Sequence, residues 1–125
     1  EQLGELVDFI SIDVAFISLD KVLPVATTLL KDTGSLVALI KPQFEAGKEK
    51  VGKGGIVRDR AVHEEVLSRI LQVAYDCKLY GLTFSPIKGT EGNIEFLGYF
   101  TKSEEGALSI TDELITAVVD EAHML

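Results

Sequence analysis

The chain has 125 residues, of which 46% are apolar, and a formal net charge of −8. This length predicts a single domain, and the apolar share suffices for a core, which excludes a disordered tail. No apolar run approaches the roughly 18 residues of a membrane-spanning helix, and the acidic charge argues at first against a nucleic-acid partner. The single cysteine, Cys77, excludes an internal disulfide and indicates a reducing compartment, so we expect a cytoplasmic location. One cysteine and two histidines far apart in the sequence provide no zinc or haem spacing, and no metal is expected.

A basic island interrupts the acidic sequence at residues 41–60. These residues hold six basic and three acidic groups, a net charge of +3, whereas the other 105 residues carry six basic and 17 acidic groups, a net charge of −11. A local excess of positive charge can steer an anion to one place on a surface. A run of lysines is also often only a solvated loop, and charge alone leaves both interpretations open.

The first part of the chain predicts a strand, a helix and a second strand. Residues 9–14 form an apolar, β-branched run that is typical of a buried strand. Residues 18–30 have apolar side chains at three- and four-residue spacing and predict a helix, with Pro24 near its first turn and Gly34 ending it. Residues 36–40 form another apolar run and predict a second buried strand.

The middle of the chain predicts a long loop followed by a helix. Residues 43–60 contain four glycines and no apolar periodicity, which is typical of a mobile, functional loop. Asp59 suits the N-cap of a helix over 60–77. His63 is expected on the surface of its first turn, and Cys77 at its end is expected to be a small packed side chain. The apolar stripe of this helix is predicted to consist of Val62, Val66, Ile70, Val73 and Ala74.

The last part of the chain predicts a strand pair and a final helix. Strands over 79–84 and 94–100 are separated by a short, turn-rich link, so we expect them to pair antiparallel. Thr111 is predicted to cap a helix over 111–125. The alternation of strands and helices predicts an α/β fold with a mostly parallel sheet, flanking helices and an antiparallel last strand at or near the edge. The buried stripe of the final helix is predicted to consist of Leu114, Ala117, Val118, Ala122 and Leu125.

Three charged residues are predicted to meet at one edge of this sheet. Asp13 ends the first strand and Lys41 follows the second, and the carboxyl ends of parallel strands form the edge where sites of open α/β sheets occur. Glu95 lies near the start of the antiparallel strand, which begins at that edge. Each residue also has a simpler interpretation: a turn cap for Asp13, an exposed terminator for Lys41 and a solvent-facing edge residue for Glu95. The residues alone leave both possibilities open.

Three motifs, in this order along the chain, resemble one known family. They are IDVAFIS at residues 12–18, LIKPQFEAG at 39–47, and SPIKG followed by GNIEF within 85–96. Together they resemble the TlyA-type haemolysin family, whose members are FtsJ-like ribosomal RNA 2′-O-methyltransferases. The resemblance covers about residues 5–100 and leaves the final helix, about 111–125, outside. It implies a partial Rossmann-like fold of the S-adenosylmethionine-dependent methyltransferases.

The family has a Lys-Asp-Lys-Glu tetrad in its active site. Asp13 matches the Asp, Lys41 the second Lys and Glu95 the Glu, and the resemblance places Asp13 also at the cofactor. The first Lys and the Gly-rich loop that binds S-adenosylmethionine have no counterpart here. We therefore expect residues 1–125 to be the carboxyl-terminal portion of a methyltransferase domain, and to be inactive alone.

The implied reaction needs these residue types. A ribose 2′-hydroxyl must lose a proton as it attacks the methyl group, and a lysine can take that proton only if its pKa falls from about 10.4 toward roughly 7 to 8. The resemblance assigns this role to Lys41, with Asp13 and Glu95 orienting the ammonium groups and the ribose. The implied partner is ribosomal RNA or a ribosomal subunit, whose phosphates would contact the basic side chains Lys48, Lys50, Lys53, Arg58 and Lys88.

Two other functions remain open. One is an inert RNA- or protein-binding fragment, since half of the cofactor pocket has no counterpart. The other follows the haemolysin name, but the acidic final helix disfavours a membrane-lytic role and a membrane partner. A truncated sheet would leave the edge of its first strand unpaired. We expect this edge either to self-associate or to be covered by the helix over 111–125.

Overall fold

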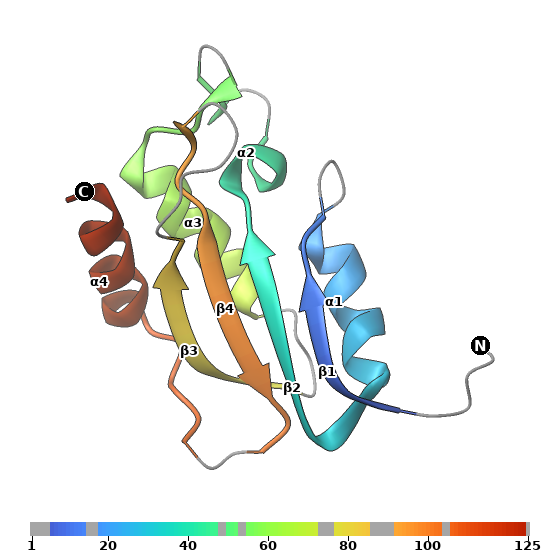
Figure 1. Ribbon diagram of the computed structural model, residues 1–125. Coiled ribbons are helices and arrows are strands. Elements are labelled where there is room, and N and C mark those ends of the chain that lie inside the picture. Colours follow the sequence, from blue (N-terminus) through green and yellow to red (C-terminus); the bar gives the residue numbers. More distant parts are fainter. Residues whose placement is uncertain are drawn as a thin grey trace.

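The computed structural model describes residues 6–14, 18–47, 50–52, 55–72, 77–85, 92–103 and 106–124. These residues form one four-stranded sheet and four helices (Figure 1). In chain order the elements are β1 (Val7–Ile12), α1 (Leu19–Thr28), β2 (Leu30–Ile40), α2 (Pro42–Glu45), α3 (Arg60–Leu71), β3 (Lys78–Phe84), β4 (Phe96–Thr101) and α4 (Asp112–His123).

The sheet has the strand order β1-β2-β4-β3. β1 pairs parallel with β2, and β4 pairs antiparallel with both β2 and β3. β1, β2 and β3 therefore run in one direction and β4 runs against them, which confirms the α/β class and the reversed last strand. β4 lies one strand in from the edge, and β3 is the edge strand. This order brings the start of β4 directly beside the end of β2.

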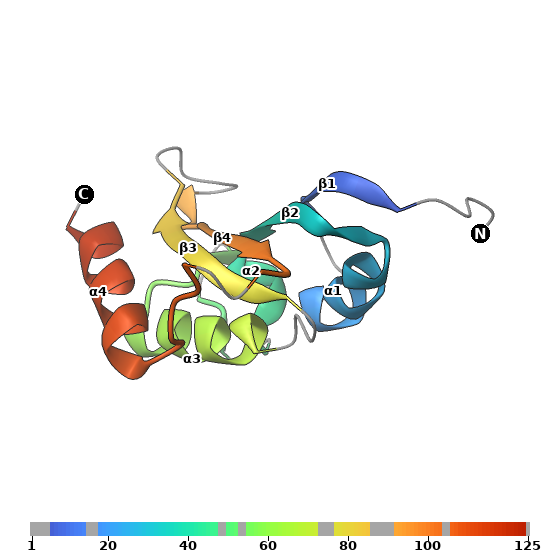
Figure 2. The same ribbon diagram turned by 90° about the horizontal axis from the view of Figure 1, so that it is seen from below.

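The helices lie on one face of the sheet. Figure 2 shows α1 and α3 on the same side of the strands, with α4 beside α3 at the β3 end. Side chains of β2 and β4 alternate between buried and half-buried over most of their length, because successive residues of a strand point to opposite faces. The core between the sheet and the helices is formed by fully buried side chains that include Leu23, Leu36, Ile40, Leu67, Ile70, Phe96 and Phe100.

The connection from α1 to β2 differs from the prediction. α1 ends at Thr28, β2 begins at Leu30, and Gly34 lies inside β2 rather than at the end of the helix. A Cβ atom on Gly34 would lie 2.7 Å from Leu30 Cδ1 and 2.9 Å from the backbone oxygen of Asp8. Gly34 therefore allows β1 and β2 to approach each other closely. The prediction that Gly34 ends the helix considered only its neighbours in sequence and could not detect this contact.

Two further helix predictions are corrected. Pro24 lies inside α1 rather than in its first turn. α3 ends at Leu71, before the predicted end at Cys77. Residues 73–76, which include Val73 and Ala74 of the predicted stripe, lie outside the described residues. Cys77 is buried just before β3, as expected for a packed side chain. The described part of the predicted stripe is buried and consists of Val62, Val66 and Ile70.

α4 begins as predicted, but it buries a different face. The side chain of Thr111 accepts a hydrogen bond from the Leu114 N–H and caps the helix. Ala117, predicted to be buried, is exposed, and Leu114 is only half-buried. Leu125 lies outside the described residues. The buried side chains are Ile115, Val118, Val119 and Ala122.

α4 packs against α3 and β3, at the opposite end of the sheet from β1 (Figure 1). Arg60 of α3 and Asp120 of α4 form an ion pair across this contact. The expectation that the final helix covers the edge of the first strand is therefore wrong. Leu6, just before β1, and Val7 and Phe9 within it are exposed. No helix within the described ranges is long and apolar enough to cross a membrane.

Candidate active site

Lys41 and Asp13 form an ion pair at the carboxyl ends of β2 and β1. Because the two strands are parallel and paired, their ends lie at the same edge of the sheet, and Lys41 Nζ is 2.6 Å from Asp13 Oδ1. The Lys41 side chain is 18% exposed and the Asp13 side chain 60%. Lys41 is thus held over the strand ends, while its carboxylate partner stays accessible to a bound molecule.

Glu95 lies beside this pair, immediately before β4. Phe96 pairs with Ile40 in the β2–β4 ladder, so Glu95 and Lys41 are the next residues at the same edge. Glu95 is 6% exposed, and its Oε2 accepts a hydrogen bond of 2.9 Å from Gln43 Nε2. The solvent-facing interpretation of Glu95 is therefore wrong. The backbone positions of Asp13, Lys41 and Glu95 lie at the same edge of the sheet.

Gln43 is a residue of this edge that the sequence prediction missed. It lies in α2, within the stretch 43–60 that was expected to be a loop. Pro42 occupies the first turn of α2, where a missing N–H costs nothing, and Lys41 is the N-cap. The sequence Lys-Pro-Gln directly after a strand could have indicated α2, because a proline at that point can begin a helix as well as end a strand.

The predicted RNA-binding side chains are only partly described. Lys50 and Arg58 are exposed, as a phosphate contact requires. Lys50 Nζ is 2.5 Å from Glu65 Oε1, so the positive charge of Lys50 is balanced by an acidic neighbour on α3. Lys48, Lys53 and Lys88 lie outside the described residues.

Asn93 ties the basic loop to the segment that carries Glu95. Its side chain is buried, with Oδ1 accepting a hydrogen bond of 2.9 Å from the Val57 N–H and Nδ2 donating one of 3.0 Å to the Gly55 oxygen. One amide side chain thereby satisfies two backbone groups of the loop, and it holds residues 55–57 against the segment that leads to Glu95.

Replacing Asn93 by Ala is expected to lower the free energy of unfolding by about 1–3 kcal/mol, because the Val57 N–H and Gly55 carbonyl lose their partner. Urea unfolding measures this change, and hydrogen exchange of the Val57 amide should accelerate beyond the change in global stability. Thr83→Ala, on the exposed face of β3, is the control. An unchanged exchange rate of the Val57 amide would contradict the conclusion that Asn93 holds the loop in place.

The two histidines, far apart in the sequence, lie together in the structure. His63 is fully buried, which corrects its predicted surface position. Its Nδ1 is 2.8 Å from His123 Nε2, and its Nε2 is 3.2 Å from the Val57 oxygen. Because a carbonyl only accepts, His63 Nε2 carries the proton and His63 Nδ1 accepts from His123. Desolvation by burial, reinforced by His123, lowers the pKa of His63 from 6.5 to about 4.

The histidine pair lacks the further ligands that a metal centre needs. Across the described ranges, no three His, Cys, Asp or Glu side chains gather closely enough to hold a metal ion. The pair instead links α3, α4 and the loop at Val57, with His63 also in edge-to-face contact with Phe96 of β4.

The chain is similar to known methyltransferases. A family model described as FtsJ-like methyltransferase matches residues 1–102. A Bacillus subtilis protein provisionally named rRNA methyltransferase YqxC is 51% identical over 122 residues, covering 93% of this chain and 43% of that protein. The 16S/23S rRNA (cytidine-2′-O)-methyltransferase TlyA of Mycobacterium tuberculosis is 34% identical over 111 residues, covering 87% of this chain and 41% of that protein.

A solved structure shares both fold and sequence with the chain. It comes from Streptococcus thermophilus, is provisionally named a hemolysin, and matches with a TM-score of 0.86 and 45% identity. The match covers 98% of this chain and 45% of that one. The chain therefore spans about two fifths of the length of the curated relatives above and somewhat less than half of this solved chain.

Proposed function

Because this chain belongs to the FtsJ-like methyltransferase family, we propose that it carries part of an active site for S-adenosylmethionine-dependent 2′-O-methylation of ribose in ribosomal RNA. The observation that carries the proposal is the placement of the Lys41–Asp13 ion pair beside the Glu95–Gln43 hydrogen bond. The activity belongs to a longer protein, since the chain spans about two fifths of the length of its relatives. The 125 residues alone are proposed to be inactive.

Lys41 is proposed to act on the ribose 2′-hydroxyl. Its nitrogen lies at the carboxyl ends of β1 and β2, 2.6 Å from Asp13 Oδ1, at the edge that also carries Glu95. The ion pair with Asp13 must open before the amine can act on the hydroxyl, so the contact is proposed to hold Lys41 in place until the ribose binds.

S-adenosylmethionine supplies the methyl group when it is bound. The exposed carboxylate of Asp13 fits this cofactor, because it can accept hydrogen bonds from the cofactor's ammonium or hydroxyl groups. The Gly-rich loop of the family has no counterpart in these 125 residues. The rest of the cofactor pocket is therefore assigned to the remainder of the longer protein.

Ribosomal RNA is the proposed partner, and the basic loop is its proposed contact. Arg58 borders a cavity of about 300 Å³ that is also lined by Ile94 and His123. Ile94 directly precedes Glu95. An RNA strand at this cavity is therefore proposed to reach the edge of the sheet that carries Asp13, Lys41 and Glu95, which we call the reactive edge. Lys48, Lys53 and Lys88 are proposed to add phosphate contacts, whose affinity would fall as salt is raised.

The test is methyl transfer from labelled S-adenosylmethionine to ribosomal RNA by the longer protein. Label in RNA that depends on the protein supports the proposal, and its absence with ribosomal subunits and naked RNA alike would contradict it. An inert RNA- or protein-binding fragment is the second candidate for the isolated chain. Micromolar binding of S-adenosylmethionine to the 125-residue chain, measured by calorimetry, would refute that alternative.

Self-association through the first strand remains a proposal as well. Phe9 is 58% exposed on β1, which has an unpaired edge within the described sheet. An exposed apolar strand edge is a template for further pairing, so either a second copy or the remainder of the longer protein is proposed to cover it.

A further inference from the structure

We propose that Glu45 and Arg69 are positioning residues, which lock the short helix α2 in place and thereby hold Lys41 and Gln43 at the reactive edge. The inference rests on the proposed function for its catalytic meaning. The contacts of Glu45 and Arg69 lie within this chain, so a measurement that requires no enzymatic activity can test their role.

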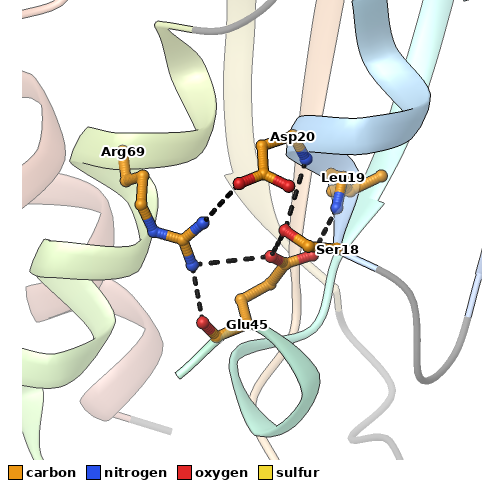
Figure 3. Close-up of polar contacts among 5 residues, drawn as sticks. All are labelled: Ser18, Leu19, Asp20, Glu45 and Arg69. Atoms are coloured by element: carbon orange, nitrogen blue, oxygen red, sulfur yellow. Dashed lines mark hydrogen bonds and ion pairs between the residues drawn. The ribbon is translucent and has the colours of Figure 1, made fainter. Parts of the chain in front are cut away.

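The carboxylate of Glu45 is buried against the start of α1. Its side chain is 3% exposed, and its two oxygens have different partners (Figure 3). Oε1 accepts a hydrogen bond of 2.6 Å from the Ser18 hydroxyl, and Oε2 accepts one of 2.8 Å from the Leu19 N–H. The Ser18 oxygen in turn accepts from the Asp20 N–H. Glu45 therefore supplies the negative charge that the N-terminus of α1 favours, from a residue distant in sequence.

Arg69 of α3 completes the contact from the other side. Its Nη2 donates a hydrogen bond of 2.6 Å to the backbone oxygen of Glu45 and lies 3.5 Å from Glu45 Oε1. Its Nη1 donates to Asp20 Oδ2 at 3.4 Å. Figure 3 shows the guanidinium between Asp20 of α1 and Glu45 at the end of α2. One arginine thus joins three helices, and it balances the charge of a buried carboxylate that would otherwise be costly.

α2 depends on these contacts because it is too short to hold itself. It has four residues, a single turn, and a helix of this length is unstable without tertiary support. Lys41, its N-cap, has no side-chain hydrogen bond that caps the helix. The contacts of Glu45 therefore anchor the C-terminal end of α2, together with the Gln43–Glu95 hydrogen bond and the Lys41–Asp13 ion pair nearer its start.

A shift of α2 would be transmitted to the reactive groups. Lys41 and Gln43 lie four and two residues before Glu45, within the same turn of backbone. Release of Glu45 would let that turn move, and it would weaken both the Lys41–Asp13 ion pair and the Gln43–Glu95 hydrogen bond. The Glu45 side chain contacts Ser18, Leu19 and Arg69 rather than Lys41 or Asp13, so its effect is one of position.

The test compares Glu45→Gln and Arg69→Met with Glu65→Gln in the 125-residue chain. Glu65 lies on the same helix as Arg69, but its ion pair with Lys50 is exposed, which makes it a matched control. The readout is the rate at which limiting acetic anhydride acylates each lysine, followed by mass spectrometry. Lys102, which donates to the Leu30 oxygen far from α2, is the internal reference.

We expect acylation of Lys41, relative to Lys102, to accelerate roughly fivefold in both Glu45→Gln and Arg69→Met, as the loss of one stabilising contact allows. Glu65→Gln should increase the acylation rate of Lys50 and leave that of Lys41 unchanged. If Glu45 and Arg69 only stabilised the fold, the acylation rates of Lys41 and Lys102 would rise together. That result would overturn the proposal, and so would an unchanged acylation rate of Lys41. If either variant fails to fold, Arg69→Lys takes its place, because lysine keeps the positive charge but lacks the two guanidinium nitrogens that contact Asp20 and Glu45. Arg69→Lys should give a smaller increase in the acylation rate of Lys41.

Activity of the longer protein provides a second, separable readout. Glu45→Gln should lower kcat and leave the KM for RNA unchanged, because Glu45 lies behind the reactive edge rather than on the RNA path. If the wild-type protein methylates no RNA, the proposed function fails while the acylation result still decides the positioning role. A rise in KM without a change in kcat would overturn the assignment to positioning.

Discussion

Replacing Lys41 by Ala in the longer protein is expected to slow methyl transfer by roughly a hundredfold to ten-thousandfold, the usual contribution of a general acid or base. The reason is that the substitution removes the amine proposed to act on the ribose and leaves Asp13 without its ion-pair partner. The fold should persist, because an ion pair with a carboxylate as exposed as that of Asp13 contributes only about 0–1 kcal/mol. Single-turnover transfer of labelled methyl to RNA measures the effect.

Two further variants separate the roles that Lys41 could have. Lys41→Arg keeps a positive charge, but a guanidinium cannot lose its proton in a protein. Loss of activity in Lys41→Arg therefore indicates a base, whereas substantial activity indicates an orienting charge. Lys31→Ala is the matched control, because Lys31 also pairs with an aspartate of β1, Asp8, at 3.1 Å. Full activity in Lys41→Ala would contradict the proposed site.

Acidification is expected to destabilise the chain through His63. Burial, together with His123, lowers its folded pKa to about 4 from 6.5, so below pH 6.5 the unfolded state binds the proton more readily. Stability is therefore fully present above pH 6.5 and is lost as the pH falls toward 4. The linkage amounts to about 2 kcal/mol at pH 5 and about 3 kcal/mol in total.

The groups around His63 explain why its protonation destabilises the folded state. The Val57 oxygen requires a proton on Nε2, and the Nδ1 proton of a charged ring would meet His123. Asp59 favours the charged form but does not outweigh burial. Urea unfolding between pH 7 and 5 measures the loss, and His63→Gln should flatten the profile relative to the wild type. Equal pH profiles for the two proteins would contradict this account of His63.

The edge residues Asp13, Lys41 and Glu95 could be placed from sequence because each adjoins an apolar run. Such runs mark buried strands, and strand direction then determines which ends meet. The motifs around the three residues also identified the family correctly. Gln43 and Glu45 could not be placed in this way, because a helix of four residues has no periodicity to detect.

Other errors came from contacts between distant segments. His63 and His123 are 60 residues apart, and their pairing depends on how α4 packs against α3. Gly34 was interpreted locally, although its role is to let β1 approach β2. The position of β4 between β2 and β3 likewise depends on long-range pairing, which propensity and turn signals do not contain.

The most direct measurement is the position of the methyl group on the RNA. Ribosomal RNA incubated with S-adenosylmethionine and the longer protein, as wild type or Lys41→Ala, is digested to nucleosides and analysed by mass spectrometry. A site built on Lys41, Asp13 and Glu95 should yield a 2′-O-methylated nucleoside with the wild type and none above background with the variant. Methylation confined to a base, or ribose methylation equal in both proteins, would contradict it.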